Sequence, residues 1–338
     1  MSLAHSQPET PAVPRHEGRR LPLRVGTRGS PLALVQTHAF LEVIKNFCPV
    51  LRTPFMGDVP VFQEHVIRTT GDAEQKRRLA EIGGKGLFAK EIHEAMLDGR
   101  IDFAVHSLKD LETSLPPGIV LACTLKREDA RDALIFGHGC GPYDPADPFA
   151  CLPAHGVIGT SSVRRQAQLL HHRPDLRMAL LRGNVQTRLE RTERGDFSAS
   201  LLALAGLRRL GLEHRAGAAL DASFMVPSAC QGIVGVTVRE ADRELRELLS
   251  GIEDPEARAV STAERAMLAL LDGSCCTPIG GHARLLEDGS LHLTGLVARE
   301  DGSFLIRRSL AGPPAEAARI GAELGAALRA DSPADLFA

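Results

Sequence analysis

Aromatic residues are scarce in this sequence, which has no tryptophan and one tyrosine in 338 residues. The hydrophobic cores must therefore be built from Leu, Ile, Val and Ala, and few aromatic side chains are available to stack on nucleic-acid bases. The net charge of -2 also provides no general attraction to nucleic acid or to an anionic membrane. We expect no nucleic-acid partner, and any positive charge that matters must be local.

Membrane spans, metal motifs and disulfide motifs are missing as well. No run of about 18 apolar residues occurs, so no membrane partner is expected. The seven cysteines form no C-x-x-C pair, and their odd number fits free thiols in a reducing compartment. Residues 1–20 lack the apolar core of a signal peptide. We predict a cytoplasmic protein without a bound metal and with a disordered leader over residues 1–20.

Strand-like and helix-like segments alternate over the first 110 residues. Five segments follow this order: strands at 23–27, 65–72 and 101–110, a helix after Ser30, and a helix carrying Phe88, Ile92 and Met96. Ser30 is a favourable N-cap, and Pro31 suits the first helical position. The β-α-β-α-β order is typical of an α/β layer that binds ligands at the carboxyl ends of its strands.

A second α/β unit is expected from about Arg131, because strand-turn-helix patterns recur three times after it. From residue 255 the pattern changes. A helix is predicted from Asp254-Pro255 to Leu271, and the two later Asp-Gly pairs predict an antiparallel meander. An alanine-rich helix ends the chain, so the last part is predicted to be a small α+β domain.

Arginines recur at the predicted strand-to-helix turns, beside small residues: Arg28, Arg164, Arg165, Arg182 and Arg188. A helix N-terminus offers free N–H groups and partial positive charge, and guanidinium groups add bidentate donors. The hydroxyls of Thr160 and Ser162 are further donors. We therefore predict a site for carboxylates or phosphates. The alternative is a solvated helix face, which we favour for Arg191, Arg194 and Arg208.

Asp110 ends a predicted strand, directly after Lys109. A lone Asp in such a place is often a turn former or a helix cap. Near many arginines, however, its carboxylate stays ionised and can stabilise a cation or accept a proton from nitrogen. We predict Asp110 as the central catalytic carboxylate. A Schiff base on Lys109 is disfavoured, because we expect no desolvated pocket to lower its pKa.

Two further segments leave alternatives open. GGKGLF at 83–88 lacks the spacing of a phosphate-binding loop, so Lys85 either contacts a substrate carboxylate or belongs to a hinge. Cys275 follows a predicted helix in the polar loop DGSCCTPIG. A loop cysteine is accessible for covalent chemistry, but the spacing alone does not separate a reactive thiol from a spectator.

Eight motifs occur in the order found in one known family: TRGSPLALVQ, GGKGLF, AVHSLKD, IGTSSVRRQ, LRGNVQTRL, LALAGLRRLGL, ACQGIVG and DGSCCTPIG. From about residue 21 to its end the chain resembles the hydroxymethylbilane synthases, also called porphobilinogen deaminases. The resemblance implies two α/β domains that resemble type II periplasmic binding proteins, with a cleft between them, and a small α+β C-terminal domain. ACQGIVG would return the chain to the first domain. The implied domains are 21–126 plus 230–250, 131–226, and 255–338.

The resemblance also implies an activity, a cofactor and a set of roles. The activity is that of a monomeric transferase of haem biosynthesis, which condenses porphobilinogen units with release of ammonia into the linear tetrapyrrole hydroxymethylbilane. The chain grows on a dipyrromethane cofactor held by a thioether to Cys275. Asp110 would hydrogen-bond pyrrole nitrogens and stabilise the azafulvenium cation left when ammonia departs. The other implied contacts are Lys109, Thr160, Ser162, Arg164 and Arg165 to the cofactor's acids; Arg28, Ser30, Arg182 and Arg188 to the substrate; Lys85 and Phe88 in a covering loop; and Gln36 and Gln231 lining the cleft.

Two positions depart from the family pattern. Glu112 stands where the family usually has a proline, two residues after the catalytic Asp, and Cys276 directly follows the expected attachment cysteine. A different class of protein, a non-catalytic two-lobed protein that binds an anion or solute, remains the alternative. The lack of a signal peptide and the presence of a third domain with the cysteine loop argue against it.

Overall fold

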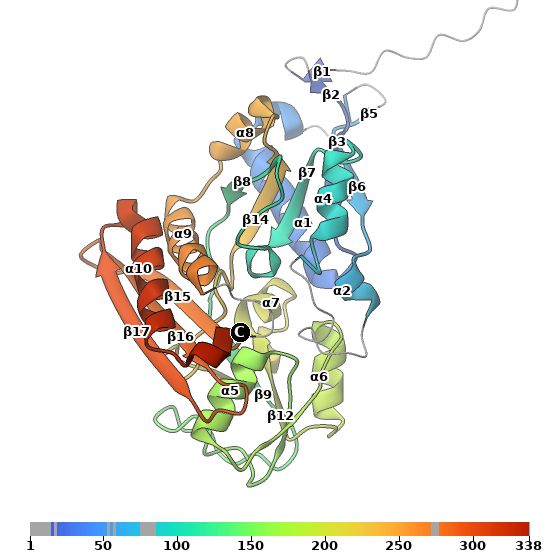
Figure 1. Cartoon of the computed structure of the whole chain (residues 1–338). Coiled ribbons are helices and arrows are strands. Elements are labelled where there is room, and N and C mark those ends of the chain that lie inside the picture. Colours follow the sequence, from blue (N-terminus) through green and yellow to red (C-terminus); the bar gives the residue numbers. More distant parts are fainter. Residues whose placement is uncertain are drawn as a thin grey trace, which may run out of the picture.

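The computed structural model describes residues 15–16, 19–52, 55–56, 59–74, 86–271 and 277–337. Within these ranges the chain forms three units, each built on its own sheet (Figure 1). Lys85, Cys275, Cys276 and most of the predicted leader lie outside the described residues. In the described part of the chain, no helix combines the length and apolar character needed to cross a membrane.

The first sheet has five strands in the order β6-β3-β7-β14-β8. Its strands are β3 (Leu23–Thr27), β6 (Phe62–Val66), β7 (Phe103–Ser107), β8 (Ile119–Thr124) and β14 (Val234–Arg239). β3 pairs in parallel with β6 and β7, whereas β14 is antiparallel to β7 and β8. Three helices accompany this sheet: α1 (Pro31–Phe47), α4 (Lys90–Leu97) and α8 (Arg243–Ser250). Val25, Phe40 and Phe103 are fully buried in its core.

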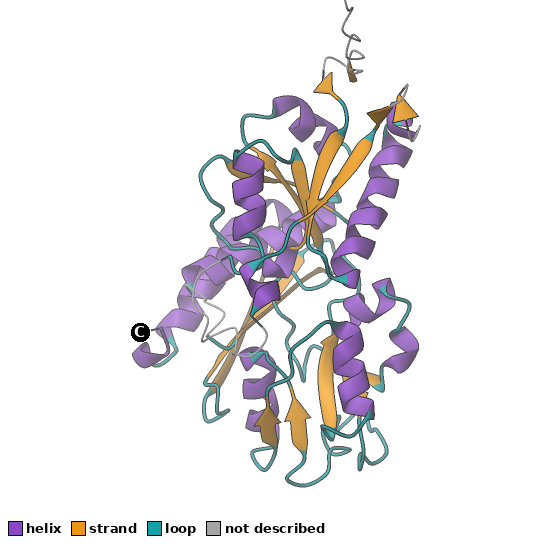
Figure 2. Cartoon of the chain, turned by 90° about the vertical axis from the view of Figure 1, so that its right-hand side faces the viewer, coloured by secondary structure: helices purple, strands orange, loops and turns teal. Residues whose placement is uncertain are grey.

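The second sheet repeats this arrangement with the order β11-β10-β12-β9-β13. Its strands are β9 (Asp132–Phe136), β10 (Val157–Gly159), β11 (Arg177–Ala179), β12 (Ala199–Ala203) and β13 (Ala218–Ala219). The helices are α5 (Val163–His172), α6 (Val185–Glu193) and α7 (Leu204–Arg209). β10, β11 and β12 are parallel, and β9 runs antiparallel beside β12. The two sheets lie one beyond the other along the molecule (Figure 2).

The chain crosses twice between the two units, because β14 belongs to the first sheet. β14 joins the first sheet after the whole second unit has been formed, so crossings occur at 125–131 and at 220–233. Glu264 of the third unit is bonded to both crossings. Its fully buried carboxylate lies 2.6 Å from Arg127 and accepts the backbone N–H of Cys230.

The third unit consists of α9 (Pro255–Leu270), the antiparallel strands β15 (Ile279–Leu285), β16 (Leu291–Ala298) and β17 (Leu305–Gly312), and α10 (Ala317–Ala330). Gly289 and Gly302 have φ of 79° and 75°, the left-handed backbone that the Asp-Gly turns require. α9 contacts β8 of the first unit, and α5 of the second unit contacts β16 and β17. The predicted α/β class with a small α+β C-terminal unit is confirmed.

The remaining short elements are β1 (Arg15–His16), β2 (Arg19–Arg20), β4 (Phe55–Met56), β5 (Val59–Pro60), α2 (Thr70–Ala73), and 3₁₀ turns at Pro49–Arg52, Leu108–Asp110, Glu213–Arg215, Pro314–Glu316 and Ala334–Phe337.

Three predicted boundaries are wrong near the first sheet. The strand predicted at 65–72 ends at Val66, because Thr69 and Asp72 form a capping box that starts α2. The helix predicted to carry Phe88 begins only at Lys90. The strand predicted over 101–110 ends at Ser107 and turns into a 3₁₀ segment. The predicted N-cap is correct, since Ser30 Oγ accepts the N–H of Ala33 at 3.3 Å.

Candidate active site

A cavity of about 1070 Å³ lies where the carboxyl ends of the parallel strands of both sheets meet. Residues just beyond β3, β7, β10, β11 and β12 line it, among them Arg28, Asp110 and Arg182. Leu268 and Thr277 of the third unit also border the cavity. Parallel strands deliver their following turns to one edge of a sheet, which explains why distant turn residues converge here.

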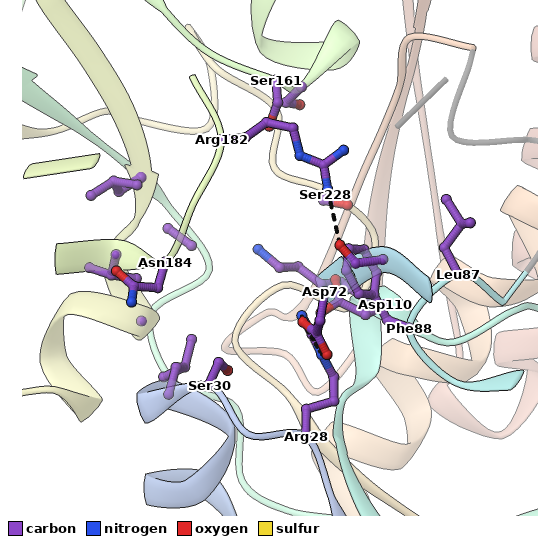
Figure 3. A pocket seen from close by; sticks show the side chains of 18 of the residues that line it. Arg28, Ser30, Asp72, Leu87, Phe88, Asp110, Ser161, Arg182, Asn184 and Ser228 are labelled. Atoms are coloured by element: carbon purple, nitrogen blue, oxygen red, sulfur yellow. Dashed lines mark hydrogen bonds and ion pairs between the residues drawn. The ribbon is translucent and has the colours of Figure 1, made fainter. Parts of the chain in front are cut away.

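Arg28 lies at the centre of the first-unit side of the cavity. Its Nη2 is 2.5 Å from Asp72 Oδ1, its Nη1 is 3.5 Å from Asp110 Oδ2, and its guanidinium carbon lies 4.1 Å from the centre of the Phe88 ring. Burial alone would raise the pKa of Asp72, but the hydrogen bond and charge of Arg28 prevail and hold it below its usual range. In Figure 3, Arg28 and Arg182 approach Asp72 and Asp110 from opposite sides.

Asp72 was not singled out by the sequence analysis. It lies in TTGD, a segment that was predicted to be a strand, and its role depends on the turn that forms there instead. The capping-box spacing, Thr69 followed three residues later by an acidic residue, was the available signal.

Lys109 reaches into the open cavity, where its Nζ donates to Gln231 Oε1 at 3.1 Å. Protein groups crowd around the ammonium although cavity water can reach the side chain. This desolvation, aided by the charges of Arg165 and Arg164 and opposed by Asp110 and Asp132, lowers the pKa of Lys109 to about 8. The expectation that no desolvated pocket would lower the pKa of Lys109 is therefore wrong.

Arg164 and Arg165 are almost completely buried and share one carboxylate, that of Asp132. Arg164 Nη2 lies 2.8 Å from Asp132 Oδ2, and Arg165 Nη2 lies 2.7 Å from Oδ1. Gln231 Nε2 also donates to Asp132 Oδ1, at 2.9 Å. Burial opposes ionisation of Asp132, but the two guanidinium groups outweigh it and hold its pKa well below the usual range.

Asp132 was also missed by the sequence analysis. It opens β9 in the run RDAL, and no spacing links it to arginines more than 30 residues later. Arg164 and Arg165, which were predicted to bind an anion, both line the cavity. Each guanidinium already forms an ion pair with Asp132. One negative charge against two positive charges leaves an excess positive charge beside the cavity.

Arg182 and Arg188 line the second-unit side of the cavity. Arg182 Nη2 donates to the carbonyl of Gly71 at 3.2 Å, and Arg188 Nε donates to the carbonyl of Gly183 at 2.9 Å. Burial and the nearby charges of Arg165 and Arg182 lower the pKa of Arg188 to about 10, so it remains a cation at neutral pH. In the part of the chain that the structure describes, Arg188 forms no ion pair with a carboxylate, which leaves its charge available to an anion.

The other predicted residues take different places around the cavity. Ser30, Phe88, Ser162 and Gln231 line it. Thr160 and Gln36 do not border it: Thr160 Oγ1 accepts the N–H of Ser162, and Gln36 Oε1 accepts the hydroxyl of Ser107.

The three arginines assigned to solvated helix faces bind nearby carboxylates. Arg191 and Arg194 pair with Asp196, and Arg208 pairs with Glu128 and Glu213. Of these three, Arg191 also borders the cavity.

The donor set of the cavity suits carboxylates rather than metal ions. Guanidinium, ammonium and hydroxyl groups from both α/β units surround Asp110. Among the described residues, no group of three or more His, Cys, Asp or Glu side chains is arranged to hold a metal. The arrangement can bind several carboxylates at once, and the carboxylate of Asp110, beside Arg28, can stabilise positive charge.

Comparison with known proteins agrees with this geometry. Residues 23–247 match the family model of the porphobilinogen deaminase dipyromethane cofactor binding domain, and residues 259–330 match that of the porphobilinogen deaminase C-terminal domain. A porphobilinogen deaminase of Paracoccus denitrificans is 45% identical and spans 94% of this chain and 96% of its own. A chloroplastic porphobilinogen deaminase of Oryza sativa is 44% identical over 86% of this chain and 78% of its own.

A solved periplasmic VFT2 domain of Bordetella pertussis BvgS covers 71% of this chain and 92% of its own at 12% identity, with a TM-score of 0.37. The family models together span nearly all of the three structural units. The chain belongs to the porphobilinogen deaminase family.

Proposed function

We propose that this protein is a hydroxymethylbilane synthase, a transferase that condenses porphobilinogen units into a linear tetrapyrrole. The observation that carries the proposal is the placement of Asp110 in a cavity lined by arginines from both α/β units. Porphobilinogen has acetate and propionate side chains, which require cations, and its reaction develops positive charge, which requires a carboxylate.

The cavity fits a dipyrromethane cofactor. Its volume of about 1070 Å³ exceeds what one small ligand needs. Thr277, which follows Cys275 by two residues in the sequence, lines the cavity, and this supports a thioether to Cys275. When bound, the cofactor supplies the pyrrole carbon to which the first substrate unit is added. Lys109, Ser162, Arg164 and Arg165 would hold its carboxylates, with Thr160 orienting the turn at Ser162.

The chain's own residues would bind the substrate and stabilise the charge that develops in the reaction. Arg28, Ser30, Arg182 and Arg188 would bind the carboxylates of the incoming porphobilinogen. Asp110 would accept hydrogen bonds from pyrrole N–H groups and stabilise the positive charge that develops as the aminomethyl C–N bond breaks. Each condensation breaks one C–N bond and forms one C–C bond, and the proton displaced from the acceptor carbon converts the departing ammonia to ammonium.

Several supporting assignments belong to the same proposal. Lys85 and Phe88 would cover the cavity, and Phe88 already stacks on Arg28. Gln231 would orient Lys109, and Gln36 would support the wall through Ser107.

The proposed domains are 21–126 plus 230–250, 131–226 and 255–338, following the three sheets. We further propose that the protein acts in the cytoplasm as a monomer.

Intact-mass analysis tests the proposal. The purified wild-type protein should be heavier than the bare chain by one dipyrromethane, and Cys275→Ser should lose this adduct. Cys276→Ser is the matched control and should retain it. A non-catalytic solute-binding protein would show the bare mass in all three and would not convert porphobilinogen after cofactor loading, and that result would refute the enzyme assignment.

A further inference from the structure

Glu112 borders the same cavity two residues after Asp110, but its carboxylate is not used by the contacts described above. Its Oε2 is buried and has no hydrogen-bond partner in the described part of the chain. A buried carboxylate oxygen loses its hydration, so its lack of a partner calls for a donor that the described residues do not supply. Asp110, in contrast, faces the guanidinium of Arg28.

His93 lies on α4, close enough to Glu112 for the two side chains to interact electrostatically, and its ring nitrogens also lack hydrogen-bond partners in the described part of the chain. Its side chain is 2% exposed, and neither ring nitrogen has a hydrogen-bond partner among the described residues. Burial lowers the pKa of His93 and outweighs the opposing charge of Glu112, so the ring is neutral at neutral pH. A neutral imidazole always has one nitrogen that accepts a hydrogen bond.

The neighbouring groups His106 and Arg265 do not form hydrogen bonds with the ring nitrogens of His93 or with Oε2 of Glu112. The ring of His106 lies 5.9 Å from that of His93 and bonds Thr237 Oγ1 at 2.9 Å instead. Burial, His93 and Arg28 lower the pKa of His106 to about 3, so it adds no positive charge. Arg265 directs its Nη2 to the carbonyls of Glu112 and Thr113, at 2.6 and 3.1 Å, rather than to the carboxylate.

The backbone around Glu112 holds its carboxylate in place. Arg265 holds the main chain at Glu112 and at the next residue, Thr113, through those two carbonyls. Gly86 lies against Glu112 Oε1 with φ of 83°, and a side chain at Gly86 would collide with that oxygen. Glu112 and His93 are therefore two ordered acceptors that do not bond each other.

We propose that Glu112 and His93 form an ammonium-binding subsite beside Asp110, which takes the nitrogen that leaves the substrate. An ammonium group is small, carries N–H donors in all directions and has the charge that an unpaired carboxylate requires. The subsite rests on the proposed function for its substrate, since only an aminomethyl compound reacting at Asp110 releases nitrogen there.

The chemistry of the departure is consistent with this acceptor pair. The aminomethyl nitrogen enters as –NH3⁺, and when the C–N bond breaks both electrons remain on nitrogen, which leaves as NH3. The positive charge stays on the pyrrole-derived fragment, next to Asp110. Glu112 binds the protonated amine before cleavage and, with His93, accepts hydrogen bonds from the ammonia afterwards.

Ammonium binding to the holoenzyme without substrate tests the subsite directly. Ammonium chloride is titrated while the His93 ring resonances, identified as those lost in His93→Gln, are followed by NMR. Potassium chloride supplies the same charge without N–H donors, and tetramethylammonium chloride supplies a cation whose nitrogen cannot donate. We expect saturable shifts with ammonium only, and affinity weakened about 10-fold or more in Glu112→Gln. Glu94→Gln, an exposed position next to His93 on α4, should bind as the wild type does.

Other outcomes overturn the proposal. Shifts of equal size with potassium would mean that the site senses ionic strength alone. No shift with any salt would mean that a water molecule or a direct Glu112–His93 hydrogen bond satisfies the pair. A large loss of thermal stability in Glu112→Gln, measured without ammonium, would assign the carboxylate to folding.

A kinetic measurement separates this proposal from the proposed function. With porphobilinogen as substrate, Glu112→Gln should raise KM about 10-fold more than Glu94→Gln does, because one charge-assisted hydrogen bond to the amine is lost. If the wild type does not turn over porphobilinogen, the proposed function fails while the ammonium titration still decides the subsite. If it turns over normally and Glu112→Gln keeps the wild-type KM, the subsite alone is refuted.

Discussion

Oδ1 of Asp132 lies 2.7 Å from Nη2 of Arg165, and both residues are almost completely buried. Asp132 is the first residue of β9, where the chain has just crossed into the second unit, and Arg165 lies in the first turn of α5. The pair, together with Arg164, places fixed positive charge at the cavity wall. Neutral replacement of Asp132 leaves two buried guanidinium groups without a counter-charge.

We therefore expect Asp132→Asn to lower the free energy of unfolding by about 3–5 kcal/mol, the usual cost of breaking a buried ion pair on one side. Chemical denaturation measures this change. Asp196→Asn, which removes a carboxylate from an exposed pair with Arg194, should change the denaturation midpoint little. If both substitutions lowered the free energy of unfolding equally, burial of the ion pair would not explain the effect of Asp132→Asn.

Asp72 should act on substrate binding through Arg28. Asp72→Asn removes the carboxylate that fixes this guanidinium at 2.5 Å. Loss of one charge-assisted contact predicts a KM for porphobilinogen about 10-fold higher, with a smaller effect on kcat. Glu64→Gln is the control. Glu64 lies on β6 of the same sheet and pairs with His38 at the surface, so this substitution should leave KM unchanged. A fall in kcat alone would assign Asp72 a different role.

Asp110→Asn should slow condensation while the protein remains folded. The substitution keeps the size of the side chain but removes the negative charge that stabilises the developing cation, so a decrease in kcat of about 10²–10³ is expected. Single-turnover rates measure the decrease, and circular dichroism checks the fold. Near-normal turnover would remove Asp110 from the catalytic role.

Lys109 should give carboxylate binding a step near pH 8. Its pKa is lowered to about 8, so it is charged below that pH and becomes neutral as the pH rises through it. Affinity for a dicarboxylate such as succinate, measured by calorimetry on the cofactor-free Cys275→Ser protein, should thus fall up to about 10-fold between pH 7 and pH 9. Lys109→Arg should remove the step, because a guanidinium remains charged across this range. A persisting step would assign the titration to another group.

Local patterns predicted much of the fold. Ser30 and Pro31 marked the start of α1 because capping chemistry depends on adjacent residues. The Asp-Gly pairs marked the turns of the third sheet for a similar reason, since glycine tolerates the left-handed backbone. The strand predicted through TTGD is wrong, because Thr69 and Asp72 form a capping box there that starts a helical turn.

The sequence by itself determined the three-part organisation, the family and the presence of arginines at strand-to-helix turns, because these features lie in contiguous runs of residues. Only the tertiary structure decided which of those arginines already have a carboxylate partner. Asp72 and Asp132 reach Arg28 and Arg165 across 44 and 33 residues of chain. The same holds for Lys109, whose pKa depends on desolvation of its ammonium by surrounding protein groups and on charges of the second unit. Electrostatic environment follows distance in space, and distance in space is set by the packing of the two sheets around their shared cavity.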